Sequence, residues 1–172
     1  MLNQFIPREV VRSVYDIDLD ALKQRGFKGL ITDLDNTLVG ARVPYATPEL
    51  ADWLKLVQSR GFKIVIVSNN SRERVSAFAE PLSVPFIHRA KKPIRFAFRK
   101  SLNIMQLGAN EAAMIGDQML TDILGANRMG IHTILVEPIA IQDESPFTKI
   151  NRRIERFVVA ALRKNGWEDS HG

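Results

Sequence analysis

The sequence predicts a three-layer α/β fold, in which a parallel sheet of about five strands lies between two layers of helices. Short apolar runs alternate along the chain with amphipathic stretches of helical length, a pattern typical of βαβ units. The apolar runs are continuous, as in IVIV at 64–67, which indicates strands that are buried on both faces.

Each element follows from local signals. Thr47 supplies an N-cap and Pro48 suits a first helical turn, so one helix begins there and Gly61 ends it. Further helices are expected over 71–80, 93–106 and 121–129. The strands are expected at 27–32, 63–67, 85–88, 112–115 and 132–136.

Length and composition favour one globular domain. The chain has 172 residues, 25% of them charged, which suits a single domain with its own core. It has no cysteine, which excludes disulfides, thiolate zinc sites and cysteine nucleophiles. No apolar run reaches the roughly 20 residues of a spanning helix, and no signal-peptide core is visible. We expect one domain over 1–172, with a core at 27–136, an N-terminal extension at 1–26 and a basic amphipathic helix at about 146–164.

Polar side chains follow four of the expected strands, where ligands bind in open parallel sheets. Crowded carboxylates raise one another's pKa, and a hard cation such as Mg²⁺ relieves their repulsion. A hydroxyl and a lysine suit phosphate oxygens, whereas zinc is disfavoured because no Cys/His cluster exists. The residues at these strand ends are Asp33, Asp35, Ser68, Asn69, Lys92, Gly116, Asp117 and, about a helical turn later, Asp122.

These residues lie in four motifs, which are DLDNTL at 33–38, VSNN at 67–70, KKP at 91–93 and GDQMLTD at 116–122. In this order they resemble the haloacid dehalogenase (HAD) superfamily of phosphatases, with a Rossmann-like sheet, over about residues 27–136. The stretch ITDLDNTLVG, the short spacings and the preceding small helix resemble more narrowly the phosphatidylglycerophosphate phosphatases and their uncharacterised bacterial relatives.

The resemblance implies a role for each catalytic residue. Asp33 would be the nucleophile that forms an aspartyl-phosphate, and Asp35 would be the general acid and then the general base. Ser68, the backbone amide of Asn69 and Lys92 would bind the transferred phosphoryl group.

The resemblance also implies the metal ligands and the supporting residues. Asp33, Asp117 and the main-chain carbonyl of Asp35 would bind Mg²⁺, and Asp122 would hold a water of the magnesium shell or orient Lys92. Asn36, Thr37 and Gly116 would support the site, the first two by shaping its loop.

The spacing of the motifs predicts a capless site, like that of subfamily IIIA. There are 34 residues between Asp33 and Ser68 and 23 between Ser68 and Lys92, which one helix and one strand fill. At most, residues 40–45 form a small flap. An open site accepts a large substrate, or takes its lid from another subunit or a membrane surface.

Two basic segments, 89–100 and 149–164, each carry six Lys or Arg residues within a net charge of +5. The first is either a solvated helix face or an electropositive rim that gathers a polyanionic substrate. The second accompanies an apolar stripe that either packs on the sheet or docks at a membrane. The members of that stripe are Phe147, Ile150, Ile154, Phe157, Val158, Ala161 and Leu162.

We therefore expect a Mg²⁺-dependent phosphomonoester hydrolase, and the resemblance suggests phosphatidylglycerophosphate as substrate and phosphatidylglycerol as product. Two alternatives stay open, namely a phosphatase for a soluble phosphoester, working as a homo-oligomer, and a ribosome-associated assembly protein with a vestigial site. Nucleic acid is disfavoured because no stacking motif is present. The expected location is the cytoplasm or the inner face of the membrane.

Overall fold

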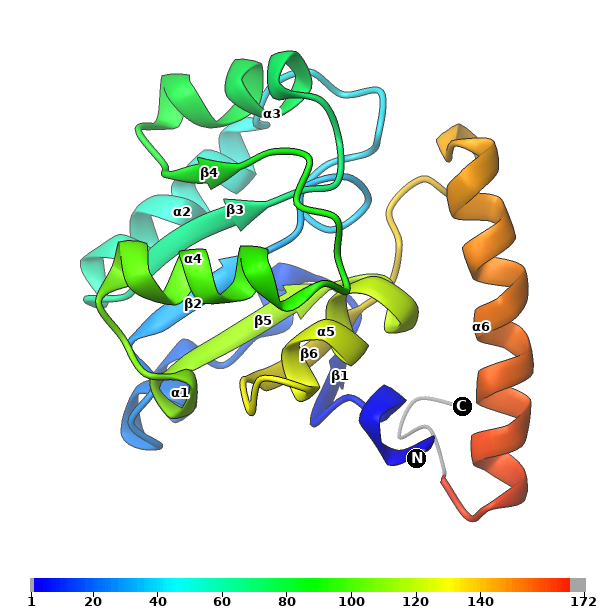
Figure 1. Ribbon diagram of the computed structural model, residues 1–172. Helices are drawn as coiled ribbons and strands as arrows, with labels where there is room; N and C mark the ends of the chain where they lie inside the picture. The colour runs from blue at the N-terminus through cyan, green and yellow to red at the C-terminus, as the bar shows by residue number, and fades with distance from the viewer. Residues whose placement is uncertain (1, 168–172) are drawn as a thin grey trace.

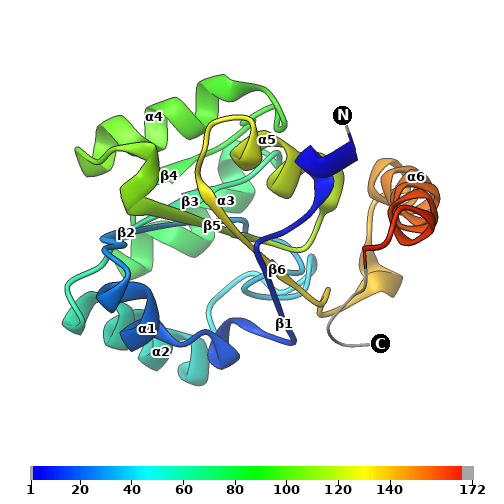
Figure 2. The same cartoon turned by 90° about the horizontal axis from the view of Figure 1, so that it is seen from below.

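The computed structural model describes residues 2–167 and contains one six-stranded parallel sheet between layers of helices (Figures 1 and 2). The strand order is β1-β6-β5-β2-β3-β4, so the predicted three-layer α/β fold is confirmed. The strands are β1 (Glu9–Val11), β2 (Gly29–Thr32), β3 (Lys63–Val67), β4 (Phe86–Ile87), β5 (Ala112–Gly116) and β6 (His132–Val136). Residues 168–172 of the C-terminal end lie outside the described residues.

Alternate side chains of the central strands enter two separate cores. Leu30 of β2 packs in a cluster with residues of α1, α2 and α3, whereas its neighbour Ile31 packs with residues of α4. The helices are α1 (Leu19–Gln24), α2 (Pro48–Ser59), α3 (Arg72–Ala79), α4 (Arg95–Met105), α5 (Leu124–Asn127) and α6 (Pro146–Lys164). Both faces of the sheet are therefore covered, as its continuous apolar strands require.

The N-terminal extension differs from the expectation because it contributes a sixth strand. Strand β1 pairs in parallel with β6, with Glu9 opposite Ile134, and forms the edge of the sheet. It has three residues, all only partly buried, and its one apolar pair, Val10 and Val11, is too short to mark a strand in the sequence. The small helix α1 that follows is capped by Asp18, whose side chain accepts a hydrogen bond from the Ala21 amide at 2.9 Å.

The helix expected over 121–129 has a different form. It begins with a π-helical turn over Met119–Ile123, and the regular helix α5 covers only Leu124–Asn127. In this turn the Gln118 amide donates to the Asp122 carboxylate at 3.2 Å. The turn thereby holds Asp122 beside the end of β5, where single π-turns often serve functional sites.

The C-terminal helix α6 stands along the side of the sheet beyond β6 and β1 (Figures 1 and 2). Of the two alternatives for its apolar stripe, packing on the sheet does not hold for most of the stripe. Of that stripe, Leu162 is buried, whereas Phe147, Ile150, Ile154 and Phe157 are exposed. Among the described residues, no helix is long and apolar enough to cross a membrane.

Candidate functional site

The carboxyl ends of β2, β3 and β5 and the loop after β4 open into one pocket of about 270 Å³. The first turns of α6 form its remaining wall, so the pocket is less open than the motif spacing alone predicts. The expected flap at 40–45 does not line the pocket. The lining residues are Asp33, Asp35, Ser68, Asn69, Asn70, Lys92, Gln118, Thr121, Ser145, Phe147, Thr148 and Asn151.

Lys92 lies at the centre of the site and bridges two carboxylates. Its Nζ donates to Asp33 Oδ1 and to Asp122 Oδ1, both at 2.7 Å, and its side chain is 2% exposed. Burial alone would lower the pKa of Lys92, but the charges of Asp122 and Asp33 outweigh it and raise that pKa above its ordinary value. The lysine is therefore a fixed positive charge between the two acids.

The backbone of Lys92 is held by one side chain from the end of β3. The Lys92 amide donates to Asn69 Oδ1 at 2.7 Å, and Asn69 Nδ2 donates to the Lys92 carbonyl at 3.3 Å. The adjacent Ser68 hydroxyl accepts a hydrogen bond from the Asn70 amide at 3.1 Å. Asn69 thus has a side-chain role, as a clamp on the lysine loop, in addition to the backbone role expected for it.

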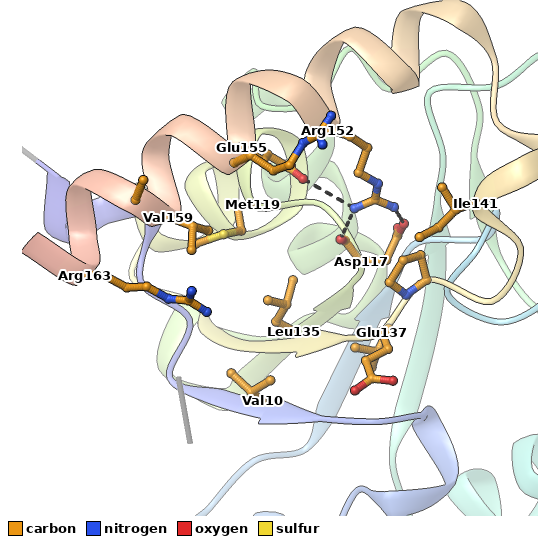
Figure 3. Close-up of a pocket in the computed structure, with 14 residues that line it drawn as sticks. Val10, Asp117, Met119, Leu135, Glu137, Ile141, Arg152, Glu155, Val159 and Arg163 are labelled. Carbon is orange, nitrogen blue, oxygen red and sulfur yellow. Dashed lines mark hydrogen bonds and ion pairs between the residues drawn. The ribbon is translucent and has the colours of Figure 1, made fainter. Parts of the chain in front are cut away.

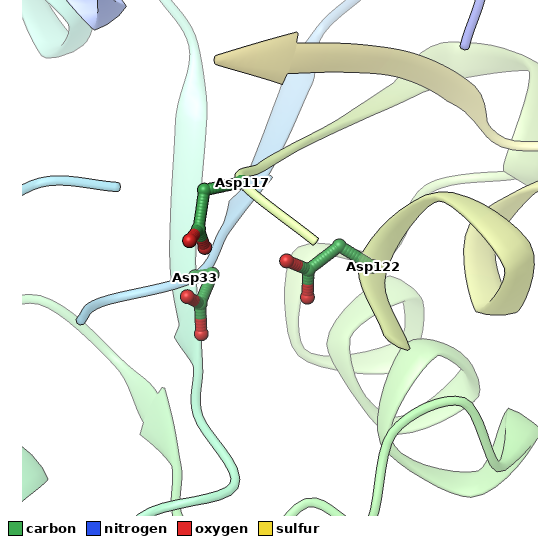
Figure 4. Close-up of side chains that lie close together, drawn as sticks. All are labelled: Asp33, Asp117 and Asp122. Carbon is green, nitrogen blue, oxygen red and sulfur yellow. The ribbon is translucent and has the colours of Figure 1, made fainter. Parts of the chain in front are cut away.

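Asp33, Asp117 and Asp122 form a buried acidic cluster in which one oxygen of each lies within 4.8 Å of the others (Figure 4). Burial and the neighbouring Asp33 charge raise the pKa of Asp117 well above its ordinary value. Burial likewise raises the pKa of Asp122 to about 6, against the opposing effect of Lys92. Such crowding disfavours the ionised acids unless a cation lies among them.

A hard divalent cation fits this cluster. Asp33 Oδ2 and Asp117 Oδ1 take no ion pair and share the Thr37 hydroxyl, at 3.4 and 3.1 Å. Asp122, by contrast, has one oxygen on Lys92 and the other on the Gln118 amide. The two carboxylate oxygens that take no ion pair are the kind of ligand that such a cation prefers, whereas both oxygens of Asp122 are already hydrogen-bonded.

Asp35 follows Asp33 by two residues but lies in a separate polar environment. Arg74 of α3 donates to Asp35 Oδ1 through Nε at 3.0 Å and Nη2 at 2.9 Å, and Asn70 Nδ2 donates to Oδ2 at 2.9 Å. Burial nevertheless raises the pKa of Asp35, with a further contribution from the Asp33 charge. A carboxyl group that keeps its proton more readily than usual is suited to acid catalysis.

The structure explains why Asn36 and Gly116 occupy their positions beside the site. Asn36 adopts a left-handed backbone with φ of 66°, and its side chain accepts from the Ala140 amide at 3.1 Å and donates to Glu144 at 3.1 Å. It thereby ties the first motif to the segment before α6. At Gly116, a Cβ atom would overlap the Asp122 carboxylate, so this position needs glycine.

Arg152 of α6 reaches the same site, which the sequence analysis did not predict. Its guanidinium pairs with Asp117 and contacts Glu155 at 3.3 Å (Figure 3). It also donates to the Asp117 carbonyl at 2.6 Å and to Glu144 at 2.9 Å. Burial would lower the pKa of Arg152, but the Asp117 charge reverses the effect and raises it. Helix α6 is therefore anchored directly to Asp117 of the site.

A larger cavity of about 710 Å³ lies beyond this ion-pair cluster, between α6 and the β1–β6 edge (Figure 3). Its walls are mainly apolar and include Val10, Met119, Leu135 and Val159. Because α6 covers the sheet incompletely here, its attachment depends on the Arg152 contacts and on Leu162, which is buried.

The chain is similar to known phosphatases in sequence and fold. The family model described as "HAD-hyrolase-like" matches residues 89–138. The chain is 46% identical over 168 residues to the "Probable phosphatase YqeG" of Bacillus subtilis (strain 168), which covers 96% of this chain and 97% of that protein. It is 32% identical over 178 residues to "Phosphatidylglycerophosphate phosphatase 1, chloroplastic/mitochondrial" of Arabidopsis thaliana, which covers 94% of this chain but 48% of that protein.

Among solved structures, the cobalt-bound form of the deoxy-D-mannose-octulosonate 8-phosphate phosphatase (YrbI) of Haemophilus influenzae matches with a TM-score of 0.51. The match has 15% sequence identity and covers 78% of this chain and 90% of that chain. At this identity the likeness concerns the fold.

Proposed function

Because the chain belongs to the HAD superfamily of phosphatases, we propose that it is a Mg²⁺-dependent phosphomonoester hydrolase that forms an aspartyl-phosphate on Asp33. One observation carries this proposal. Lys92 Nζ holds one oxygen of Asp33 at 2.7 Å, while the other oxygen faces Asp117 across the Thr37 hydroxyl. The carboxylate is thus oriented and electrostatically supported at the base of a pocket, as a nucleophile must be.

In the reaction, the two acids of the first motif, Asp33 and Asp35, act one after the other. The Asp33 carboxylate attacks phosphorus, the bond from phosphorus to the ester oxygen breaks, and Asp35 gives its proton to the departing alkoxide. Asp35 then takes a proton from the water that attacks the phosphoenzyme, which releases inorganic phosphate and restores Asp33. Lys92 and Ser68 bind the phosphoryl oxygens throughout.

Asp33, Asp117 and the main-chain carbonyl of Asp35 would hold Mg²⁺, whose positive charge would offset the charge of the phosphoryl group. We expect turnover of an aryl phosphate to require Mg²⁺, and Ca²⁺ to bind without supporting turnover. The reason is that Mg²⁺ enforces octahedral geometry at about 2.0–2.1 Å, whereas Ca²⁺ takes more ligands at longer distances and would engage both oxygens of Asp33. Phosphate release in chelator, with each ion added back, tests this. Full turnover in excess chelator would refute it.

The contact between Arg74 and Asp35 predicts a pH effect. Arg74→Gln removes a cation that lowers the pKa of Asp35, so that pKa rises. Because Asp35 must be protonated to act as the acid, the alkaline limb of the kcat/KM profile for an alkyl phosphoester moves to higher pH. Arg72→Gln, an exposed position on the same helix, is the matched control. A limb that stays in place or moves to lower pH would reject this role of Asp35.

The proposed substrate is a phosphomonoester on a lipid head group, with phosphatidylglycerophosphate as the first compound to test and an anionic phospholipid surface as the partner. The similarity to the Arabidopsis phosphatidylglycerophosphate phosphatase over 94% of this chain supports it. Phosphate release from this lipid in mixed micelles, compared with release from a panel of soluble phosphomonoesters, tests the choice. A kcat/KM for a soluble compound above that for the lipid would favour a soluble substrate.

A further inference from the structure

The outer face of α6 is apolar although it lies in solvent. Phe147, Ile150, Ile154 and Phe157 are 68%, 59%, 45% and 73% exposed. Their spacing of three and four residues places them along one side of the helix, and we call them the α6 stripe. The face that holds the helix to the protein instead contains the charged residues Arg152 and Glu155 beside the buried Leu162. This arrangement is the reverse of an ordinary surface helix, and exposed apolar patches of this kind mark interaction sites.

The α6 stripe has a basic border on one side, and α6 itself carries no exposed acidic side chain. Glu155 is the one acidic residue within α6, and it is buried. The border consists of Lys149, Arg153, Arg156 and Lys164, all exposed, and none of the four forms an ion pair within residues 2–167. Within residues 2–167, the face therefore combines apolar surface with positive charges that form no ion pair.

The α6 stripe begins at the mouth of the catalytic pocket. Phe147, its first member, lines the same pocket as Asp33 and Asp35. A surface that covers the stripe therefore comes to lie against the pocket opening. Because no described helix can span a membrane, contact with a bilayer through this face would be interfacial, with the apolar side chains at the depth of the head groups.

We propose that the α6 stripe and its basic border dock on a bilayer that contains anionic lipids, with α6 lying in the plane of the interface. Charge decides between this occupant and a second copy of the chain. Two copies that paired along their stripes would bring two basic borders together with no exposed acidic side chain on either α6, whereas anionic head groups neutralise the borders. That docking brings a lipid substrate to the catalytic pocket rests on the proposed function, whereas the binding to a bilayer does not.

Vesicle co-sedimentation of the full chain tests the docking. Vesicles of phosphatidylcholine alone are compared with vesicles that also contain phosphatidylglycerol, at low and high salt. We expect binding to the anionic vesicles at low salt that weakens as salt screens the charges. The double variant Ile154→Ser with Phe157→Ser is expected to lower the apparent partition coefficient for anionic vesicles about 10-fold or more. We expect a similar loss for the double variant Arg153→Gln with Arg156→Gln.

Matched controls separate α6 from exposed residues elsewhere. Leu56→Ser with Ile104→Ser removes two exposed apolar side chains from α2 and α4, and Arg99→Gln with Lys100→Gln removes two exposed cations from α4. Both control variants should bind anionic vesicles like the wild type. All four variants should keep wild-type turnover of a soluble aryl phosphate, since none of these residues lines the pocket.

Three results would overturn the docking proposal. They are no binding to anionic vesicles at low salt, an equal loss in the α6 and control variants, or a dimer in light scattering that Ile154→Ser with Phe157→Ser dissociates. The last result would assign the stripe to a second copy of the chain. If vesicle binding behaves as expected while no phosphomonoester is hydrolysed, the docking stands and the proposed function fails.

Discussion

Asp33→Asn is expected to abolish phosphate release, with kcat reduced at least about 10⁴-fold. The amide keeps the shape of the side chain and can still contact Lys92, so the fold should persist while the nucleophile is lost. Steady-state phosphate release from an aryl phosphate measures the effect. Asp52→Asn, at an exposed carboxylate on α2, is the control and should retain wild-type turnover. A kcat for Asp33→Asn within 10-fold of the wild type would assign the nucleophile to another residue.

Lys92→Met is expected to lower the free energy of unfolding by about 3–5 kcal/mol, which is typical when one member of a buried ion pair is removed. The variant leaves Asp33 and Asp122 buried without the cation that joins them at 2.7 Å on each side. Urea unfolding in chelator measures the loss.

The double variant Lys92→Met with Asp122→Asn is the matched test of this explanation. It removes one of the two unpaired charges, so part of the lost stability should return. A destabilisation below about 1 kcal/mol for Lys92→Met, or no recovery in the double variant, would show that the lysine contributes little through these charges.

The central part of the fold was predictable from sequence because its strands are buried on both faces. Most residues of β2, β3 and β5 are apolar and buried, and clear capping residues such as Thr47 and Ser71 mark the helices between them. Strand β1 gave no comparable signal, since it is a short edge strand whose side chains are half-buried and whose pairing with β6 joins residues more than 120 positions apart.

The clustering of the predicted site residues could be inferred from the sequence because parallel strands bring their carboxyl ends to one edge of a sheet. The structure places Asp33, Asp35, Ser68, Asn69 and Lys92 around one pocket. It also brings Asp117 and Asp122 within 4.8 Å of Asp33.

Arg74, Glu144 and Arg152 were not predicted, because their contacts depend on how helices and loops return to that edge. Arg152 in particular stands in a run of basic residues that looks solvated. Its one local signal is Glu155, three residues later on the same face, with which it pairs at 3.3 Å.

The orientation of α6 shows a limit of hydrophobic periodicity. The pattern correctly predicts a helix over Pro146–Lys164, but it cannot say which face meets the protein. Here the ion pair of Arg152 with Asp117 and the hydrogen bond that Glu155 accepts from the Leu120 amide at 3.0 Å hold the polar face inward. The apolar face is left outward as a consequence, which is the basis of the docking proposal.

Chemical trapping of the phosphoenzyme in Asp35→Asn tests the central claim most directly. An aryl phosphate has a leaving group that needs little acid assistance, so Asp33 should still be phosphorylated, while loss of the base slows hydrolysis by about 10²–10⁴-fold. Rapid quenching with labelled substrate and peptide mapping should therefore find label that approaches one phosphate per chain, labile to hydroxylamine, on the peptide that contains Asp33. Label that is stable to hydroxylamine and maps to Ser68, or the absence of any trapped label, would contradict the account.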